Sequence, residues 1–252
     1  MGKPIVDRMY WIPKGSLSPS ELMVLQSKLQ ITGKETGFGE AKTLNLIDFI
    51  SKPGFIGIPR AFGFGRYGNE VVDGTVFPKC SLPEFNRKLW KEQVRAMIDV
   101  VSSLVDEGKY GGILNGVCGS GKTTVALAIC SAISTPTVIL LHKQDLIDQW
   151  IGEILGTKEK KAGLPGCDIG IVQGKVCDFE NKHIVLASVK TLFLHEDMLR
   201  RRGFFSSFGL VIMDECHHVP ALMFDAAIKS FSARFRLGLS ATLFRSDGFD
   251  SI

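Results

Sequence analysis

Residues 116–123 constrain the fold more than any other stretch of this 252-residue chain. They match the phosphate-binding pattern G-x-x-x-x-G-K-[ST] at each fixed position. The run consists of Gly116, Val117, Cys118, Gly119, Ser120, Gly121, Lys122 and Thr123. Residues 110–115 before it indicate a short buried strand, and residues 122–134 after it indicate a helix. Strand, loop and helix in this order predict an α/β domain with a phosphate-binding turn.

The residue types in this stretch suit a nucleoside triphosphate. Its three glycines let the backbone wrap closely around an anion and direct N–H donors at the oxygens, and the start of the helix adds a partial positive charge. Lys122 supplies a mobile charge for the β- and γ-phosphates, and the Thr123 hydroxyl is placed to bind Mg²⁺. We therefore expect residues 116–123 and the neighbouring Thr124 to bind ATP and Mg²⁺. A chance glycine-rich turn is the alternative.

The composition excludes several classes of protein. Hydrophobic residues make up 45% of the chain and charged residues 22%, which is ordinary for a globular protein and unlike a disordered one. The six cysteines form no C-x-x-C pair, and neither an apolar targeting segment nor a membrane-spanning run occurs. We expect a soluble, intracellular protein with free thiols. The net charge of +4 is compatible with a nucleic-acid partner without arguing for one.

Residues 1–82 are predicted to form a small α+β domain. Strand-like residues 5–12 are followed by Ser18, Pro19 and Glu21, the pattern of a capped helix start. A glycine-rich stretch with aromatic residues follows from about residue 61. Two interpretations of these aromatics stay open: a nucleic-acid-binding surface, or turns that pack the rings against the next domain, which is the simpler one.

Residues 83–252 show the alternation of an open α/β fold. Near-continuous apolar strands, expected at 137–142, 168–173, 183–188, 210–213 and 235–239, are typical of a parallel sheet covered by helices on both faces. Helices are expected between them, at 144–155, 191–202 and 220–231.

A further helix is expected ahead of the phosphate-binding run, at about residues 84–107. Its apolar face would consist of Leu89, Trp90, Val94, Met97, Ile98 and Val101. Gln93 lies near its start, and a side-chain amide ahead of a phosphate loop can read the edge of an adenine ring. Gln93 is therefore a candidate ATP-binding residue, although a single glutamine on a helix is more often only solvated.

Two carboxylates follow the apolar strand at 210–213 directly. Because the carboxyl ends of parallel strands share one edge of a sheet, Asp214 and Glu215 are expected to meet the phosphate loop. Asp214 would hold Mg²⁺, and Glu215 would polarise the attacking water. Together with Lys122 they are the candidate catalytic residues. A charge pair at the start of a helix is the alternative.

The strand at 235–239 ends in small hydroxyl residues. Ser240 and Thr242 are expected to bond His217 or Asp214 and so to sense the state of the nucleotide site. A Ser-Ala-Thr run has no specificity alone. Its place after the phosphate loop and the two carboxylates makes it informative.

These segments in their order, GVCGSGKT, DECH and SAT, resemble motifs I, II and III of superfamily 2 helicases and translocases of the DExH type. LWKEQ (89–93) is similar to the adenine-reading region of that superfamily, and GLSATLFRSDG (238–248) to a segment of XPB-like and UvsW-like DNA translocases. The resemblance covers about residues 85–250 and implies a RecA-like fold for residues 83–252. It implies ATP-dependent movement on DNA, with an RNA helicase or a nucleotide-gated binding module as alternatives.

The resemblance also implies a track for nucleic acid. Residues 137–150 resemble motif Ia, and residues 183–192 resemble the region near motif Ib. The residues expected to hold the backbone of DNA, or of RNA in the alternative, are Lys143, Gln149, Ser188 and Lys190. Two of these depart from the residues usual in the family, as do His142 and Leu243. Motifs IV to VI of such motors lie in a second RecA-like domain that this sequence lacks, so we expect a fragment or a truncated chain.

Overall fold

The structure is a computed structural model that describes residues 2–33, 42–215 and 221–241. Contacts between residues divide the chain into two compact units. The first runs to Thr75 and includes residues 221–232, and the second starts at Val76. The domain limits expected from the sequence stay predictions. No helix in the described part of the chain is long and apolar enough to cross a membrane.

The first unit combines short strands with helices. Its strands are β1 (Ile5–Val6), β2 (Tyr10–Pro13), β3 (Gln30–Gly33), β4 (Lys42–Asn45), β5 (Phe55–Ile58) and β6 (Val72–Asp73). Its helices are the 3₁₀ turn η1 (Lys14–Ser16), α1 (Pro19–Leu29), α2 (Arg60–Tyr67) and α8 (Ala221–Ser230). One sheet has the order β5-β2-β1-β6, and β3 pairs with β4 in a second. In the first sheet only β1 and β6 run parallel.

Helix α1 begins at the cap that the sequence predicts. The hydroxyl of Ser18 accepts a hydrogen bond from the backbone N–H of Glu21 at 3.3 Å, and the Glu21 carboxylate accepts one from the backbone N–H of Ser18 at 2.8 Å. Pro19 occupies the first helical position. This reciprocal capping box satisfies two backbone donors that a helix start otherwise leaves unpaired.

The glycine-rich stretch expected to form turns is instead helix α2. Its aromatic rings pack against Tyr10 in the same unit: Phe64 meets that ring edge-on at 5.3 Å between centroids, and Tyr67 stacks at 6.2 Å. Gly63 allows this approach, because a Cβ there would lie 2.3 Å from Cγ of Tyr10. Gly63 therefore allows the helix to pack closely on the sheet, whereas composition alone interprets such a glycine as part of a turn.

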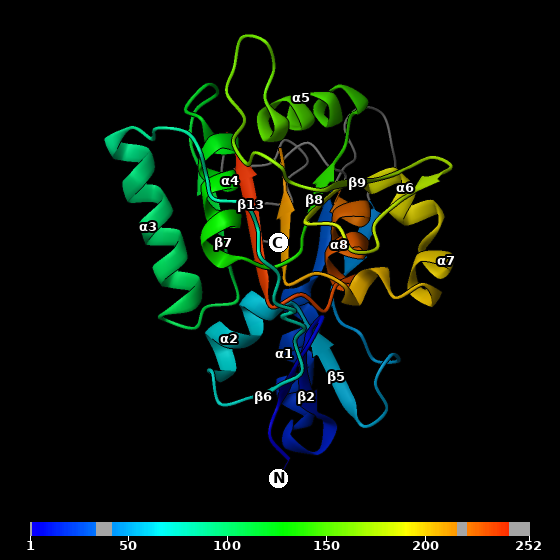
Figure 1. The fold of residues 1–252 in the computed structure, drawn as a ribbon. Coiled ribbons are helices and arrows are strands. Elements are labelled where there is room, and N and C mark those ends of the chain that lie inside the picture. The colour runs from blue at the N-terminus through cyan, green and yellow to red at the C-terminus, as the bar shows by residue number, and fades with distance from the viewer. Residues whose placement is uncertain (1, 34–41, 216–220, 242–252) are drawn as a thin grey trace. The chain divides into compact units, whose positions relative to one another are not determined.

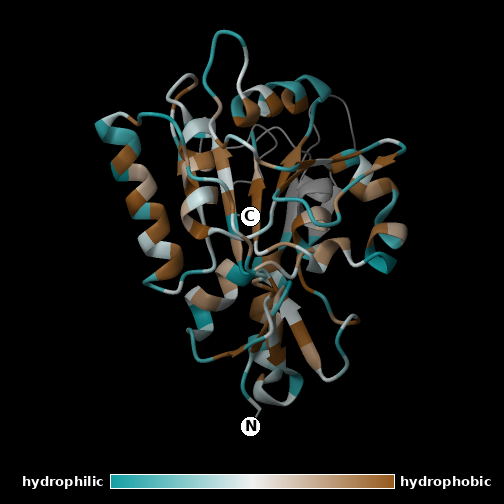
Figure 2. Ribbon diagram, viewed as in Figure 1, coloured by the Kyte–Doolittle hydropathy of each residue, from teal (hydrophilic) through white to brown (hydrophobic). Residues whose placement is uncertain are grey.

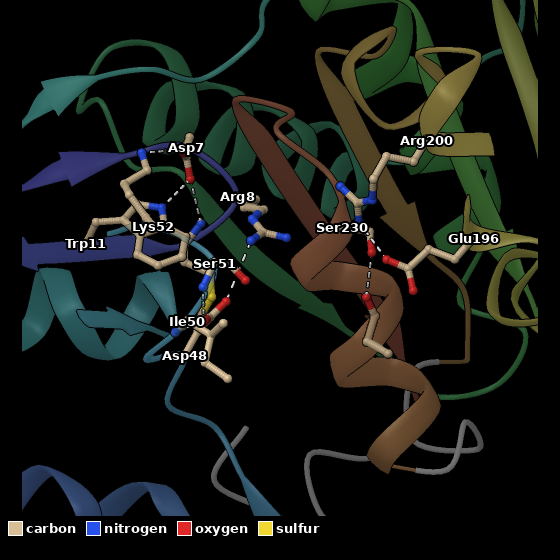
Figure 3. Close-up of polar contacts among 12 residues, drawn as sticks. Asp7, Arg8, Trp11, Asp48, Ile50, Ser51, Lys52, Glu196, Arg200 and Ser230 are labelled. Carbon is tan, nitrogen blue, oxygen red and sulfur yellow. Dashed lines mark hydrogen bonds and ion pairs between the residues drawn. The ribbon is translucent and has the colours of Figure 1, made fainter. Parts of the chain in front are cut away.

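A buried tryptophan organises the polar side of this unit (Figure 3). The indole N–H of Trp11 donates to the Asp7 carboxylate at 2.5 Å, and the Lys52 ammonium binds the same carboxylate at 2.8 Å. Lys52 and Arg8 also lie over the indole ring, at 5.2 and 5.6 Å from its centroid. Burial acts to raise the pKa of Asp7, but these hydrogen bonds outweigh it and hold the pKa below its ordinary value.

The second unit holds the larger sheet. Its strands are β7 (Gly111–Asn115), β8 (Thr137–Leu141), β9 (Ile169–Gln173), β10 (Val176–Cys177), β11 (Ile184–Ser188), β12 (Leu210–Met213) and β13 (Phe235–Ser240). Its helices are α3 (Lys91–Val105), α4 (Lys122–Ile133), α5 (Gln144–Leu155), α6 (Val189–Leu194), α7 (Glu196–Arg201) and the 3₁₀ turn η2 (Phe204–Ser206). The strand order is β10-β9-β11-β8-β12-β13-β7, and every neighbouring pair except β10–β9 is parallel.

This arrangement confirms the α/β fold with a mainly parallel sheet. Figure 1 shows α3 and α4 at the β7 end of the sheet and α6 and α7 at the opposite end. The central strands β8 and β12 are buried along their whole length, as are residues 125–130 of α4. Figure 2 shows the central strands of the sheet as mainly hydrophobic. Strands covered on both faces need apolar residues at every position, which is why their sequences are continuous rather than alternating.

The β7 end of the sheet differs from the sequence-based expectation. Strand β7 was expected to be buried, but it is the edge strand, and its Ile113 side chain is 56% exposed. Helix α3 begins at Lys91 rather than near residue 84, and part of its predicted apolar face is open: Trp90 is 66% exposed and Ile98 53%. Periodicity identified an apolar side of the helix but not how much of it α4 covers.

Alanine substitutions at two glycines of α2 test the packing against Tyr10. Gly63→Ala should lower the free energy of unfolding by about 1 to 3 kcal/mol, because its new methyl group overlaps the Tyr10 ring. Gly65→Ala is the matched control in the same helix, where a Cβ meets nothing within 4 Å. It should be neutral or stabilising by up to about 1 kcal/mol. Urea unfolding followed by circular dichroism compares them, and equal effects would contradict the packing argument.

Candidate functional site

The strand ends that carry the expected site are neighbours. Strands β12, β13 and β7 follow one another in the sheet, with Met213 opposite Gly238 and Ser240 opposite Asn115. The backbone N–H of Gly116 continues the ladder by donating to the carbonyl oxygen of Ser240 at 3.0 Å. Since neighbouring strands are about 4.8 Å apart, the carboxylates after β12 and the loop after β7 share one edge of the sheet.

The loop between β7 and α4 depends on glycine at two positions. Gly119 and Gly121 both have φ of +81°, in the left-handed region that glycine adopts without a steric penalty. At Gly121 there is a second reason, because a Cβ would lie 2.3 Å from Nε2 of Gln93. Gly121 is also the N-cap of α4, so this turn aims the free N–H groups of the helix start at the loop.

The Lys122 side chain folds back over the same loop. Its ammonium donates to the carbonyl oxygen of Gly116 at 2.7 Å and to that of Val117 at 3.3 Å. The charge therefore lies beside the backbone N–H groups of the loop. Lysine, helix start and loop backbone together make one concentrated positive region, which suits a multiply charged anion such as a triphosphate.

Gln93 ties α3 to the loop through both ends of its amide. Its Oε1 accepts from the backbone N–H of Trp90 at 3.0 Å, and its Nε2 donates to the carbonyl oxygen of Ser120 at 3.0 Å. The side chain is buried. In this arrangement Gln93 positions the loop, whereas reading of an adenine by the same amide stays a prediction.

Asp214 is a buried carboxylate with two hydrogen-bond donors. The indole N–H of Trp150 donates to its Oδ2 at 2.8 Å, and the backbone N–H of Glu215 to its Oδ1 at 2.9 Å. Burial raises the pKa of Asp214 above its ordinary value; the Trp150 hydrogen bond and the charge of Lys122 lower it in part.

Glu215 adopts a backbone conformation that is unusual for its residue type. Its φ is +49°, in the left-handed region, where a residue other than glycine carries a strain of about 1 to 3 kcal/mol. Such strain persists where the surrounding structure holds it, and it is concentrated at functional sites.

The structure does not place every predicted site residue with the phosphate loop and the two carboxylates. His217 and Thr242 fall outside the described residues, so their expected coupling role stays a prediction. Lys143 and Lys190 are exposed two residues past the ends of β8 and β11, and Ser188 is partly buried as the last residue of β11. Gln149 is exposed within α5. Trp150, which donates to Asp214, was not singled out from the sequence; it is the last residue of the segment 137–150 that resembles motif Ia.

The comparisons with known proteins agree with this geometry. A family model described as "Type III restriction enzyme, res subunit" matches residues 86–245, which is more than half of the chain, and the chain belongs to this family. A curated relative, the DNA 3'-5' translocase XPB2 of Sulfurisphaera tokodaii, is 33% identical over 178 residues, covering 71% of this chain and 35% of the relative. A protein of Acanthamoeba polyphaga mimivirus, whose name proposes an ATP-dependent RNA helicase, is 27% identical over 208 residues, covering 81% and 37%.

A solved structure supports the fold. The UvsW helicase from bacteriophage T4 matches with a TM-score of 0.58 and 15% identity over 90% of this chain and 87% of that chain. This match confirms the predicted RecA-like α/β fold, and the family model and the curated relatives confirm the resemblance to superfamily 2 helicases. The chain spans 35% to 37% of the length of the two curated relatives above.

Removing the indole N–H tests how Asp214 is held. Trp150→Phe should destabilise the chain by about 1 to 3 kcal/mol near neutral pH, because a buried carboxylate loses a donor. The hydrogen bond favours the ionised form, so its contribution is present above the pKa of Asp214 and is lost as the pH falls through it. The difference between variant and wild type should therefore shrink as the pH approaches 3.8, the ordinary value above which this pKa is raised.

Ile154→Val provides the control on the same helix. Ile154 is fully buried and apolar. Its substitution by valine leaves a cavity that should lower the free energy of unfolding by about 1 kcal/mol, whether or not Asp214 is ionised. Thermal unfolding over a pH series measures both variants. A Trp150→Phe effect as flat with pH as that of Ile154→Val would show that the hydrogen bond does not act on the ionised carboxylate.

Proposed function

We propose that this chain is the ATP-hydrolysing part of a superfamily 2 motor that moves on DNA. The observation that carries the proposal is the shared sheet edge, where the phosphate loop follows β7, the Asp214–Glu215 pair follows β12, and β13 lies between these two strands. Membership of a family with helicase relatives supports the use of ATP. Those relatives are longer than this chain, so movement by the whole motor is part of the proposal.

In this proposal the phosphate loop binds the triphosphate and the carboxylates act on it. The N–H groups of the loop and the Lys122 ammonium would bind the phosphate oxygens, where negative charge develops during transfer. Glu215 would orient the attacking water and take up its proton. The ammonium now bonded to Gly116 and Val117 would exchange those carbonyl oxygens for phosphate oxygens, which are stronger acceptors.

The residues present fit Mg²⁺ as the accompanying ion. The Thr123 hydroxyl and the Asp214 carboxylate are hard oxygen donors, and phosphate oxygens and water would complete an octahedral shell. Among the described residues no cluster of three His, Cys, Asp or Glu side chains offers a closed metal cage, which is the arrangement expected when the substrate supplies ligands. When bound, Mg²⁺ would supply neutralisation of charge on the transferred phosphoryl group.

DNA is the proposed track, with RNA as the second candidate. The name of the Sulfurisphaera tokodaii relative, a DNA 3'-5' translocase, favours DNA, and the name of the mimivirus relative favours RNA. The proposed contacts are Lys143, Ser188 and Lys190, at or close to the ends of β8 and β11, and Gln149 within α5. Such contacts grip the phosphate backbone and leave the bases unread, as a motor that moves along any sequence requires.

The deciding experiment is steady-state ATP hydrolysis by this chain, alone and with single-stranded DNA, double-stranded DNA or RNA, with ATP binding measured in parallel. Stimulation by either form of DNA above that by RNA supports the proposal, and the reverse order supports the RNA alternative. ATP binding without hydrolysis under every condition would instead indicate a nucleotide-gated binding module.

Two substitutions separate binding from hydrolysis. Lys122→Ala should weaken ATP binding on the order of tenfold to a hundredfold, because a charged donor to the phosphates is lost. Glu215→Gln should keep ATP affinity near wild type and reduce hydrolysis by about a hundredfold or more. Lys109→Ala, at an exposed lysine away from the loop, is the matched control and should change neither. Undiminished ATP affinity in Lys122→Ala would remove the basis of the phosphate-loop assignment.

A further inference from the structure

Three neighbouring parallel strands are each followed by a lysine at the same offset. Strands β8, β11 and β9 lie side by side and end at Leu141, Ser188 and Gln173. Two residues past each end come Lys143, Lys190 and Lys175, and all three lysines are exposed. We call these the lysine row. Asp145 is the only acidic residue within two positions of any of them in the sequence.

The segments that carry the lysine row are hydrogen-bonded to one another. The side-chain amide of Gln173, at the end of β9, donates to that of Gln144 at the start of α5. The backbone N–H of Gly174 donates to the hydroxyl of Thr191 on α6 at 2.9 Å. These bonds join the turn after β9 to the start of α5, next to Lys143, and to α6, which carries Lys190. Neighbouring strand ends are about 4.8 Å apart, and a row of exposed cations along such an edge suits the backbone of a nucleic-acid strand.

Helix α6 adds an exposed aromatic ring beside the row. Thr191 and Leu192 face the interior, at 7% and 2% exposure, whereas Phe193 is 54% exposed and Leu194 62%. Lys190 and Phe193 are three residues apart on the helix and therefore share its outer face. An aromatic ring that is open to solvent next to a row of cations is the combination by which proteins hold single strands, with phosphates on the cations and a base on the ring.

We propose that Phe193 stacks on a base of single-stranded DNA whose phosphates follow the lysine row, and that Lys175 is a further backbone contact on it. The occupant is identified by charge complementarity, since a row of lysines beside an aromatic ring matches a strand with charged phosphates and unpaired bases. This inference rests on the proposed function and adds to it that the bound strand is unpaired at α6. In a duplex the base faces are stacked on their neighbours and closed to the ring.

The test is equilibrium binding of the full chain to a fluorescein-labelled oligothymidine of about 16 nucleotides, followed by anisotropy. Phe193→Ala should weaken binding about fivefold to a hundredfold, and Phe193→Trp should restore it because the ring is kept. Leu194→Ala is the matched control, since it removes an exposed apolar side chain from the neighbouring position without removing a ring. It should bind like wild type. Phe193 is largely exposed, so all three variants should unfold at the wild-type temperature.

Three further measurements separate the stacking from the track. Lys175→Ala and Lys190→Ala should each weaken binding and reduce the slope of log affinity against log salt by about one. A scan of abasic sites along the oligonucleotide should find a position at which Phe193→Ala no longer weakens binding, because the partner base is already gone. With a blunt duplex of the same sequence, Phe193→Ala should bind like wild type.

The outcomes distinguish this inference from the proposed function. If the lysine variants weaken binding while Phe193→Ala does not, the stacking is wrong and the track stands. Equal losses in Phe193→Ala and Leu194→Ala would replace stacking by a general apolar contact, and an equal loss on the duplex would exclude an unpaired base. If no variant changes binding, the strand does not lie on this edge, and the nucleic-acid part of the proposed function fails with it.

Discussion

The parallel pairing of β13 with its neighbours is the interaction on which the candidate site depends. This strand lies between β12 and β7, and its ladder ends in the hydrogen bond from Gly116 to Ser240. A slip of this ladder by one residue would turn every side chain of the strand to the other face and shift the loop relative to Asp214. The buried apolar side chains of β12 and β13 oppose such a slip, since they would have to exchange faces. Packing of the apolar core thus fixes the positions of the charged groups at the strand ends.

The site itself is held at some expense of stability. Asp214 is buried and its pKa is raised, so the ionised carboxylate is disfavoured, and Glu215 beside it has a strained backbone. Trp150 offsets part of this by donating to the carboxylate from within a helix that is buried on the same side. A carboxylate kept nearly dry and only partly neutralised interacts strongly with any cation that reaches it, because the low dielectric that penalises its charge also strengthens its attraction.

Much of the fold was predictable from the sequence, because a strand that is buried on both faces has a recognisable apolar pattern. The errors fall where a local pattern does not show which surface a residue meets. Strands β8 and β12 are covered on both faces, so their sequences are almost entirely apolar, with Thr137 as the one polar residue, and easily recognised. Helix α2 was missed because Gly63 serves packing against Tyr10, and a glycine in sequence does not show which ring it faces. The exposed side of α3 and the edge position of β7 depend on strand order, which no local pattern contains. The candidate catalytic residues were identifiable from motif spacing, whereas the hydrogen bond from Gln93 to Ser120 is visible only in the structure.

Strand order also places the lysine row next to the Asp214–Glu215 pair along the edge of the sheet. The grouping of the lysine row depends on strand order, because its members follow strands that are neighbours only in the fold. Strand β8 is the common border: the backbone N–H of Asp214 donates to the carbonyl oxygen of Leu140, and Lys143 follows the end of the same strand. The strands that precede Lys143 and Asp214 are thus one spacing of about 4.8 Å apart. The β8–β12 ladder therefore fixes the start of the lysine row relative to the carboxylates by the same backbone hydrogen bonds that hold the sheet together.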